Sequence, residues 1–239
     1  VLTTMATVTY NSTEDQRNVT LAAQQIQGDL RFAQNLAISF KKHQGKFARG
    51  GYGVHFENNS SVYKIFADLD CNGASDCGPT GPLFAEGGSA TSLQDTNMSW
   101  STDQWKGGDV FIRGGKCGGN FRFLVGNNVP DNTLRIDASN PFKNPDGTPC
   151  LPDTTSEYMV FGNAQFDAAP GELVEEKRFD NVQILVPISS YDVVFSPPAP
   201  EIKANRAVIF GGARVTITVS AGAFTKLIDV YSNGLVEIR

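Results

Sequence analysis

The sequence predicts an α+β fold in which one long N-terminal helix packs on antiparallel β-sheet. Residues 3–43 contain no proline and a single glycine, Gly28. Beyond Gly50, apolar and polar residues alternate in several short segments, which is the period of a β-strand. At 239 residues the chain is long enough to bury a sizeable core in one or two domains.

The helix is expected over residues 1–45, as a spine, because apolar side chains recur there in steps of four and three. These side chains lie on one helical face and are Ala22, Ile26, Leu30, Ala33, Ala37 and Phe40. Basic residues followed by Gly45 are typical of a helix C-terminus. The segment Val1–Asn11 is uncharged and rich in β-branched residues, which favours packing against neighbouring helices or lipid. The alternative is an amphipathic cap helix with a frayed start.

Residues 46–239 are expected to form a β-rich domain that begins with a hairpin of Tyr52–Phe56 and Val62–Phe66. Further strands are predicted at Asp109–Arg113, Phe121–Val125, Leu134–Ile136, Tyr158–Phe161, Asn181–Ile188, Asp192–Phe195, Val208–Phe210, Val215–Val219, Lys226–Tyr231 and Leu235–Arg239. Residues 71–156 hold all the cysteines and many glycines, and we expect an irregular insertion there. Glu172, Glu175 and Glu176 indicate a solvated, charged loop.

Four cysteines, an even number, predict two disulfides in an exported protein. They are Cys71, Cys77, Cys117 and Cys150. No CxxC pair is present, and His43 and His55 lie outside the cysteine-bearing stretch, which argues against a zinc site. Proximity favours Cys71–Cys77 and Cys117–Cys150, although four cysteines permit three connectivities. Four reduced, buried thiols are the alternative.

A turn rich in acidic residues predicts a calcium site. Asp68, Asp70 and Asn72 stand at alternate positions before Gly73, with Asp76 further on, and their hard oxygen donors suit Ca²⁺. The full twelve-residue calcium loop is not present, because its last position is Pro79 instead of glutamate. The alternative is a polar hairpin turn in which the Asp and Asn side chains satisfy their own backbone.

No enzymatic signature is found: GxSxG, HExxH and a Walker loop are all missing, so we expect no catalytic function. His55 is interpreted as a surface or packing residue. The segment Trp100–Phe123 is interpreted as the core of a disulfide-tied lobe, with an exposed binding surface as the alternative. A net charge of −5 argues against a general nucleic-acid binder. No apolar run reaches the roughly 18 residues of a membrane-spanning helix.

Several local motifs, in this order and spacing, resemble the type IV pilin-like family, in particular the minor pilins and the FimT-like or H-type pseudopilins. Val1–Asn11 is similar to the second half of the hydrophobic pilin helix, and Gln24–Ser39 (QQIQGDLRFAQNLAIS) to the helix end of those proteins. GYGVHFE and YKIFADLDCNG resemble their first hairpin, and Phe195–Pro200 and Ile228–Arg239 their closing strands. The resemblance covers residues 1–70 and about 180–239.

The resemblance implies a structural subunit of a type IV pilus or type II secretion pseudopilus, with other pilin or pseudopilin subunits as partners. It implies anchoring in the inner membrane before assembly and a periplasmic or extracellular filament afterwards. The family's Gly-Phe-Thr-Leu-x-Glu processing site is expected upstream of Val1. The alternatives are a secreted or surface adhesin with calcium-dependent binding, and a DNA-binding minor pilin for DNA uptake. Nucleic acid is the weaker expectation.

Overall fold

The computed structural model describes residues 2–72, 83–128, 131–167, 171–197 and 201–239, with side chains described from Thr13 onward except at positions 71, 72 and 128. The chain divides into two compact units. Unit 1 comprises residues 1–41, 52–67 and 166–239, and unit 2 comprises residues 42–51 and 68–165. Each unit is described separately below.

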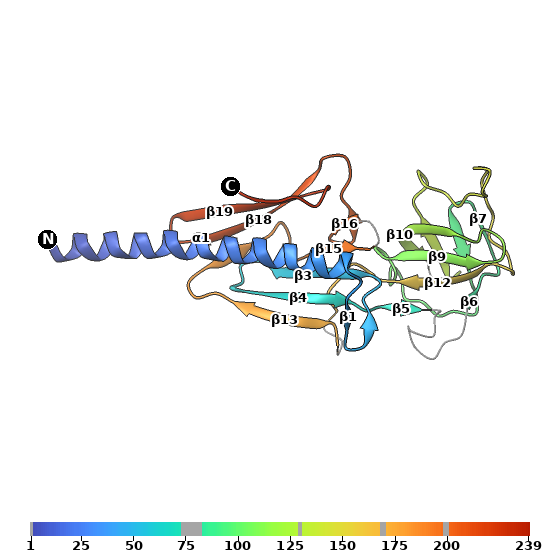
Figure 1. Cartoon of the computed structure of the whole chain (residues 1–239), viewed down its shortest axis with the longest axis horizontal. Coiled ribbons are helices and arrows are strands. Elements are labelled where there is room, and N and C mark those ends of the chain that lie inside the picture. Colours follow the sequence, from blue (N-terminus) through green and yellow to red (C-terminus); the bar gives the residue numbers. More distant parts are fainter. Residues whose placement is uncertain (1, 73–82, 129–130, 168–170, 198–200) are drawn as a thin grey trace. The chain divides into compact units, whose positions relative to one another are not determined.

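Unit 1 contains the helix α1 (Leu2–Ile38) and a six-stranded antiparallel sheet (Figure 1). In spatial order the strands are β13 (Leu173–Arg178), β4 (Val62–Asp68), β3 (Gly51–Glu57), β15 (Ser190–Ser196), β16 (Glu201–Ala204) and β17 (Ala207–Val208). The edge strand β13 carries exposed charges at Glu175, Glu176 and Arg178. Charges on an edge strand discourage pairing with another chain.

A second, four-stranded antiparallel sheet completes unit 1. Its order is β14 (Gln183–Leu185), β18 (Arg214–Ala221), β19 (Phe224–Tyr231) and β20 (Val236–Ile238). Along β18 the apolar Val215, Ile217 and Val219 are buried, whereas Thr216 and Thr218 on the other face are partly exposed. This alternation is what the period of two in the sequence demands.

Unit 2 is built on an eight-stranded antiparallel sheet. Its main path is β5 (Cys71–Asn72), β12 (Glu157–Phe161), β9 (Asp109–Gly114), β10 (Asn120–Asn128), β11 (Thr133–Ile136), β8 (Ser92–Gln94) and β7 (Gly87–Ser89), and β6 (Leu83–Phe84) pairs with β12. A small sheet of β1 (Lys42–His43) and β2 (Lys46–Phe47) belongs to the same unit.

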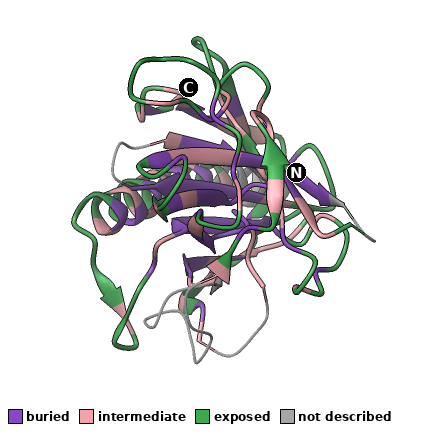
Figure 2. Cartoon of the chain, turned by 90° about the vertical axis from the view of Figure 1, so that its right-hand side faces the viewer, coloured by how far each residue is buried: buried purple, intermediate pink, exposed green. Residues whose placement is uncertain are grey.

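The core of unit 2 gathers residues that are far apart in the sequence. Trp100, Trp105, Leu134, Phe142 and Tyr158 all lie in one buried cluster. Figure 2 shows that buried residues concentrate on the strands, whereas the surrounding loops are largely exposed. Loops are exposed because their backbone polar groups need water or a local partner.

The predicted α+β class is wrong. The chain is mostly β: within the residues that the structure describes, the strands form four sheets and α1 is the single helix. The prediction failed mainly at residues 71–156, where the expected irregular insertion is an eight-stranded sheet. The strands predicted there at Asp109–Arg113, Phe121–Val125 and Leu134–Ile136 are found as β9, β10 and β11. The missed strands β5, β6, β7 and β8 have only two or three residues each, which is too short for an alternating pattern to predict a strand.

The strands predicted outside the insertion are found, with changed boundaries. The hairpin Tyr52–Phe56 and Val62–Phe66 is confirmed as β3 and β4. The predicted strand Asn181–Ile188 shortens to β14. The interpretation of the glutamate segment as a loop is wrong, because residues 173–178 form β13 and Glu172 is buried. Units 1 and 2 also divide the chain differently from the expected helix at residues 1–45 and β-rich domain at residues 46–239.

Candidate functional site

The helical face predicted for assembly lies mostly inside unit 1. Its members Ala22, Ile26, Leu30, Ala33 and Ala37 are at most 3% exposed. Residues of α1 contact β15, β18, β19 and β20 of the same unit. Phe40 is different, because it lies beyond the end of α1 and is 48% exposed. The apolar stripe therefore stabilises the unit itself, since an apolar face buried by the chain's own strands cannot also meet a partner.

Polar contacts tie the same helix to strands of both sheets in unit 1. The Tyr63 hydroxyl on β4 donates to Asp29 Oδ2 at 2.5 Å. Burial, together with the hydrogen bond to the Asp29 carboxylate and its charge, raises the pKa of Tyr63 well above its usual range. Gln27 Nε2 and Arg31 Nη2 donate to the Val236 carbonyl on β20, at 2.8 and 3.1 Å. These contacts fix the rotation of α1 about its axis.

The opposite face of α1 carries exposed apolar residues. Leu21 is 50% exposed and Phe32 is 43% exposed, and nothing lies within 4 Å of the Cβ position of Gly28. Steps of seven and four place these three residues on one side of the helix. The first buried side chain in the described part of α1 is Val19, and Figure 1 shows the preceding turns extending past the β18–β19 hairpin.

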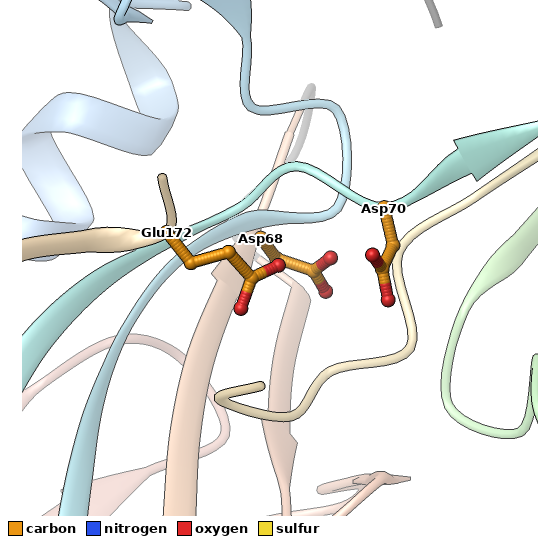
Figure 3. Close-up of side chains that lie close together, drawn as sticks. All are labelled: Asp68, Asp70 and Glu172. Atoms are coloured by element: carbon orange, nitrogen blue, oxygen red, sulfur yellow. The ribbon is translucent and has the colours of Figure 1, made fainter. Parts of the chain in front are cut away.

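The predicted acidic turn is found at the end of β4. Figure 3 shows the carboxylates of Asp68 and Asp70 close together, with an oxygen of each within 4.8 Å of the other. Asp68 is fully buried, and its Oδ2 accepts hydrogen bonds from the amides of Asn163 and Ala164, at 3.0 and 2.8 Å. Asp70 Oδ2 accepts one from Asn163 Nδ2 at 2.8 Å. Both acids therefore hold the turn that follows β12.

These contacts bear on the calcium prediction. Ca²⁺ takes six to eight oxygen ligands, and two adjacent carboxylates are suitable donors. One oxygen of Asp68 already accepts two amide hydrogens, however, and the Asn72 side chain and Asp76 lie outside the described residues. Calcium binding stays a prediction. The third side chain in Figure 3, Glu172, belongs to unit 1, where its Oε2 accepts a hydrogen bond from the Asp167 amide at 2.9 Å.

One of the two predicted disulfides is confirmed in unit 2. Cys117 and Cys150 are bonded, with their Cα atoms 5.7 Å apart. The Cys71 side chain and Cys77 lie outside the described residues. Trp100 and Trp105 are each 4% exposed in the same core as the disulfide. The interpretation of this segment as the core of a disulfide-tied lobe is therefore confirmed for both tryptophans, which are not surface groups.

A histidine–aspartate pair in unit 1 was not predicted. His55 on β3 is 9% exposed, and its Nδ1 lies 2.8 Å from Oδ1 of Asp192, the residue directly opposite on β15. The Phe166 ring lies 5.1 Å from the imidazole, between ring centroids. Packing was the correct interpretation of His55, but its partner depends on the register of β3 and β15. No single-strand pattern shows that register.

A bilayer-spanning helix is not found among the described residues, since α1 has no window that is both apolar and poor in charges. Comparisons with known proteins found no family model, no curated protein and no solved structure that matches the chain.

Proposed function

We propose that the chain is a pilin-like filament subunit that assembles through α1. The observation that carries the proposal is the reach of this helix. Its backbone is helical from Leu2 to Ile38, yet the first buried side chain in its described part is Val19. The tip of the β18–β19 hairpin reaches α1 at Asp15, and the turns of the helix before it extend past these strands (Figure 1).

Such an extending helical segment needs a partner. Isolated helices of fewer than about 12–15 residues are marginal in water, because nucleation is costly. The first turns are also poor in strong helix formers and rich in threonine and valine. A second copy of the same helix supplies the apolar contacts that the chain itself does not.

The exposed face of α1 suits this packing. Leu21 and Phe32 present apolar side chains, and Gly28 between them permits close approach of another helix. Glu14 and Arg17, three residues apart and exposed, provide opposite charges near the same face. Copies that are offset along the helix axis can pair these charges. The assembly face is therefore opposite to the buried alanine-rich stripe.

Two further observations support the proposal. The Cys117–Cys150 disulfide is typical of an exported protein, as a periplasmic or extracellular filament requires. The order of the motifs in residues 1–70 and 180–239 resembles the pilin-like family. Its implied partners are other pilin or pseudopilin subunits, with the inner membrane holding each subunit before assembly.

Cysteine crosslinking tests the assembly face. Leu21→Cys and Phe32→Cys, treated with a short bis-maleimide, are expected to give covalent dimers whose yield rises with protein concentration. Thr225→Cys is the matched control, since Thr225 is exposed on β19 in the same unit. Deleting residues 1–12 should reduce the crosslinking of both helix variants.

The same proposal makes an expectation in cells. Antibodies raised against the chain should label filaments sheared from the cell surface, or filaments formed when the producing secretion system is overexpressed. Two results together would refute the assembly function. The first is that Leu21→Cys and Phe32→Cys crosslink no more than Thr225→Cys does, and the second is that the antibodies label no filaments.

A further inference from the structure

A polar pocket of about 660 Å³ opens in unit 1 beside α1. Four segments form its walls: Asp15 on α1, Ser61 before β4, residues 178–183 between β13 and β14, and residues 220–222 at the tip of the β18–β19 hairpin. Small-molecule sites typically have volumes of about 300–1,000 Å³. The pocket is therefore large enough for a ligand of one or two ring units.

Backbone pairing holds two of these walls in place. The Phe179 amide donates to the Ser61 carbonyl at 2.9 Å, which joins the loop after β13 to the start of β4. Gln183 on β14 pairs with Ser220 on β18. The Phe179 ring lies 5.4 Å from the buried Tyr63 ring and stays half-buried at the pocket. Its position is thus fixed before any ligand arrives.

A glycine brings the third wall against the helix. Gly222 has φ +54°, a left-handed conformation that glycine adopts without steric cost. A Cβ atom there would lie 2.6 Å from Asp15 Oδ2. The absence of a side chain at Gly222 therefore lets the hairpin tip meet Asp15, another residue that lines the pocket.

The lining offers both donors and acceptors. Arg178 supplies only donors, Asp15 and Asp180 supply only acceptors, and the amides of Asn181 and Gln183 supply both. Within the part of the chain that the structure describes, the side chains of Arg178, Asp180, Asn181 and Gln183 make no hydrogen bond or ion pair with another residue. Their polar groups remain available to a ligand.

We infer that this pocket binds a neutral saccharide. Each sugar hydroxyl both donates and accepts, which matches a lining that mixes carboxylates, amides, hydroxyls and one guanidinium. An anionic ligand would meet two carboxylates and one arginine, and an apolar ligand would leave the polar groups unpaired. Phe179 also lines the pocket, and an aromatic side chain is a suitable packing partner for the C–H face of a pyranose. Saccharide binding goes beyond the proposed assembly function and does not depend on it.

Nuclear magnetic resonance titration of the whole chain tests the inference. The probes are glucose, galactose, mannose, N-acetylglucosamine and lactose, with galacturonate as a charged counterpart. At least one neutral sugar is expected to shift the backbone amides of Asn181 and Ser220, with a Kd on the order of 1 mM. Galacturonate should bind more weakly than galactose, because Asp15 and Asp180 repel its carboxylate.

Four variants locate the binding. Arg178→Gln and Asp180→Asn should each weaken binding about tenfold, which is the loss expected for one hydrogen bond to a charged group. The charge-matched controls Lys46→Gln and Asp131→Asn lie outside the pocket, on exposed positions, and should leave Kd unchanged. Circular dichroism confirms that each variant is folded.

Three results would overturn the inference. The first is that no neutral sugar shifts these amides up to roughly 20 mM, a concentration well above the expected Kd. The second is unchanged affinity in both pocket variants. The third is that Arg178→Gln and Asp180→Asn change sedimentation of the chain without any sugar effect, which would assign the pocket to contacts between copies.

Discussion

Replacing Asp229 by asparagine tests how a buried carboxylate stabilises the four-stranded sheet. Asp229 lies on β19 and is fully buried beneath two arginine side chains. Its Oδ1 accepts a hydrogen bond from Thr216 Oγ1 at 2.6 Å. Its Oδ2 lies 2.6 Å from Arg239 Nε and 3.4 Å from Arg214 Nη1. The asparagine side chain would keep the shape of the carboxylate but lose the charge that both guanidinium groups face.

The size of the effect follows from these contacts. A hydrogen bond to a charged group contributes about 1.5–3 kcal/mol to stability when it is buried. The side chains of Arg214 and Arg239 are 46% and 45% exposed, however, so solvent screens the pairs and rehydrates the arginines once the carboxylate is gone. We therefore expect Asp229→Asn to lower the free energy of unfolding by about 1–2 kcal/mol at neutral pH.

The loss should depend on pH. Burial raises the pKa of Asp229, but the hydrogen bonds from Thr216 and Arg239 and the charges of both arginines outweigh burial, so the net pKa is lowered. A carboxyl with a depressed pKa stabilises the fold above its unfolded pKa of about 3.9, and this contribution is lost as the pH falls through the folded pKa. The deficit of Asp229→Asn should therefore shrink below about pH 4.

Urea unfolding at neutral and acidic pH measures the deficit, and amide hydrogen exchange at Ile217 and Ile228 locates it. These two residues pair across β18 and β19, so their protection reports on this sheet. Asp131→Asn, which changes an exposed carboxylate in unit 2, is the control. A deficit below about 0.5 kcal/mol at neutral pH, or one of constant size down to about pH 2, would refute the reasoning.

Three further predictions concern packing, the disulfide and the acidic turn. Leu30→Ala should lower the free energy of unfolding, measured in urea, by about 2–5 kcal/mol because Leu30 is fully buried. Leu21→Ala, at a site 50% exposed, should lower it by less than about 0.5 kcal/mol. Equal losses would contradict the assignment of the two helix faces. Replacing Cys117 and Cys150 together by serine should cost roughly 3–4 kcal/mol, since the bridge closes a loop with a sequence separation of 33, and tryptophan fluorescence should report the earlier unfolding. Asp68→Asn should lower the free energy of unfolding by about 1–3 kcal/mol in thermal or urea unfolding, because the partners of Asp68 are backbone amides. The loss should be the same with calcium and with a chelator. A loss found only in the calcium sample would instead assign this carboxylate to a cation.

The sequence correctly predicted the elements in which the pattern of apolar residues repeats several times. The stripe from Ala22 to Ala37 repeats over several turns, and Val215, Ile217 and Val219 alternate through a whole strand. Strand β13 was missed because an edge strand can carry charges on both faces, so its residues resemble a loop. The core of unit 2 was predicted only in part: Trp100 was expected in a disulfide-tied core, but its neighbour in the cluster, Phe142, lies outside that segment and joins it only after folding.

The same limit applies to the functional residues. Asp68 and Asp70 could be found from spacing, but their partner Asn163 lies more than ninety positions away in the sequence. The apolar stripe of α1 was expected to meet other subunits, and the structure buries most of it against strands of the same unit, because an apolar stripe does not reveal whether the chain's own strands cover it. The pocket beside Asp15 joins four segments of unit 1, and no local pattern connects them.

Strands β4 and β13 are paired neighbours, with Phe66 opposite Leu173, although residues 68–165 of unit 2 lie between them in the chain. The ribosome therefore releases unit 2 before unit 1 has all the strands of its larger sheet. Bringing together two chain ends costs more entropy when the intervening segment is long and unfolded. A unit 2 that folds first shortens this segment, so the inserted lobe can speed the closure of the sheet that carries it.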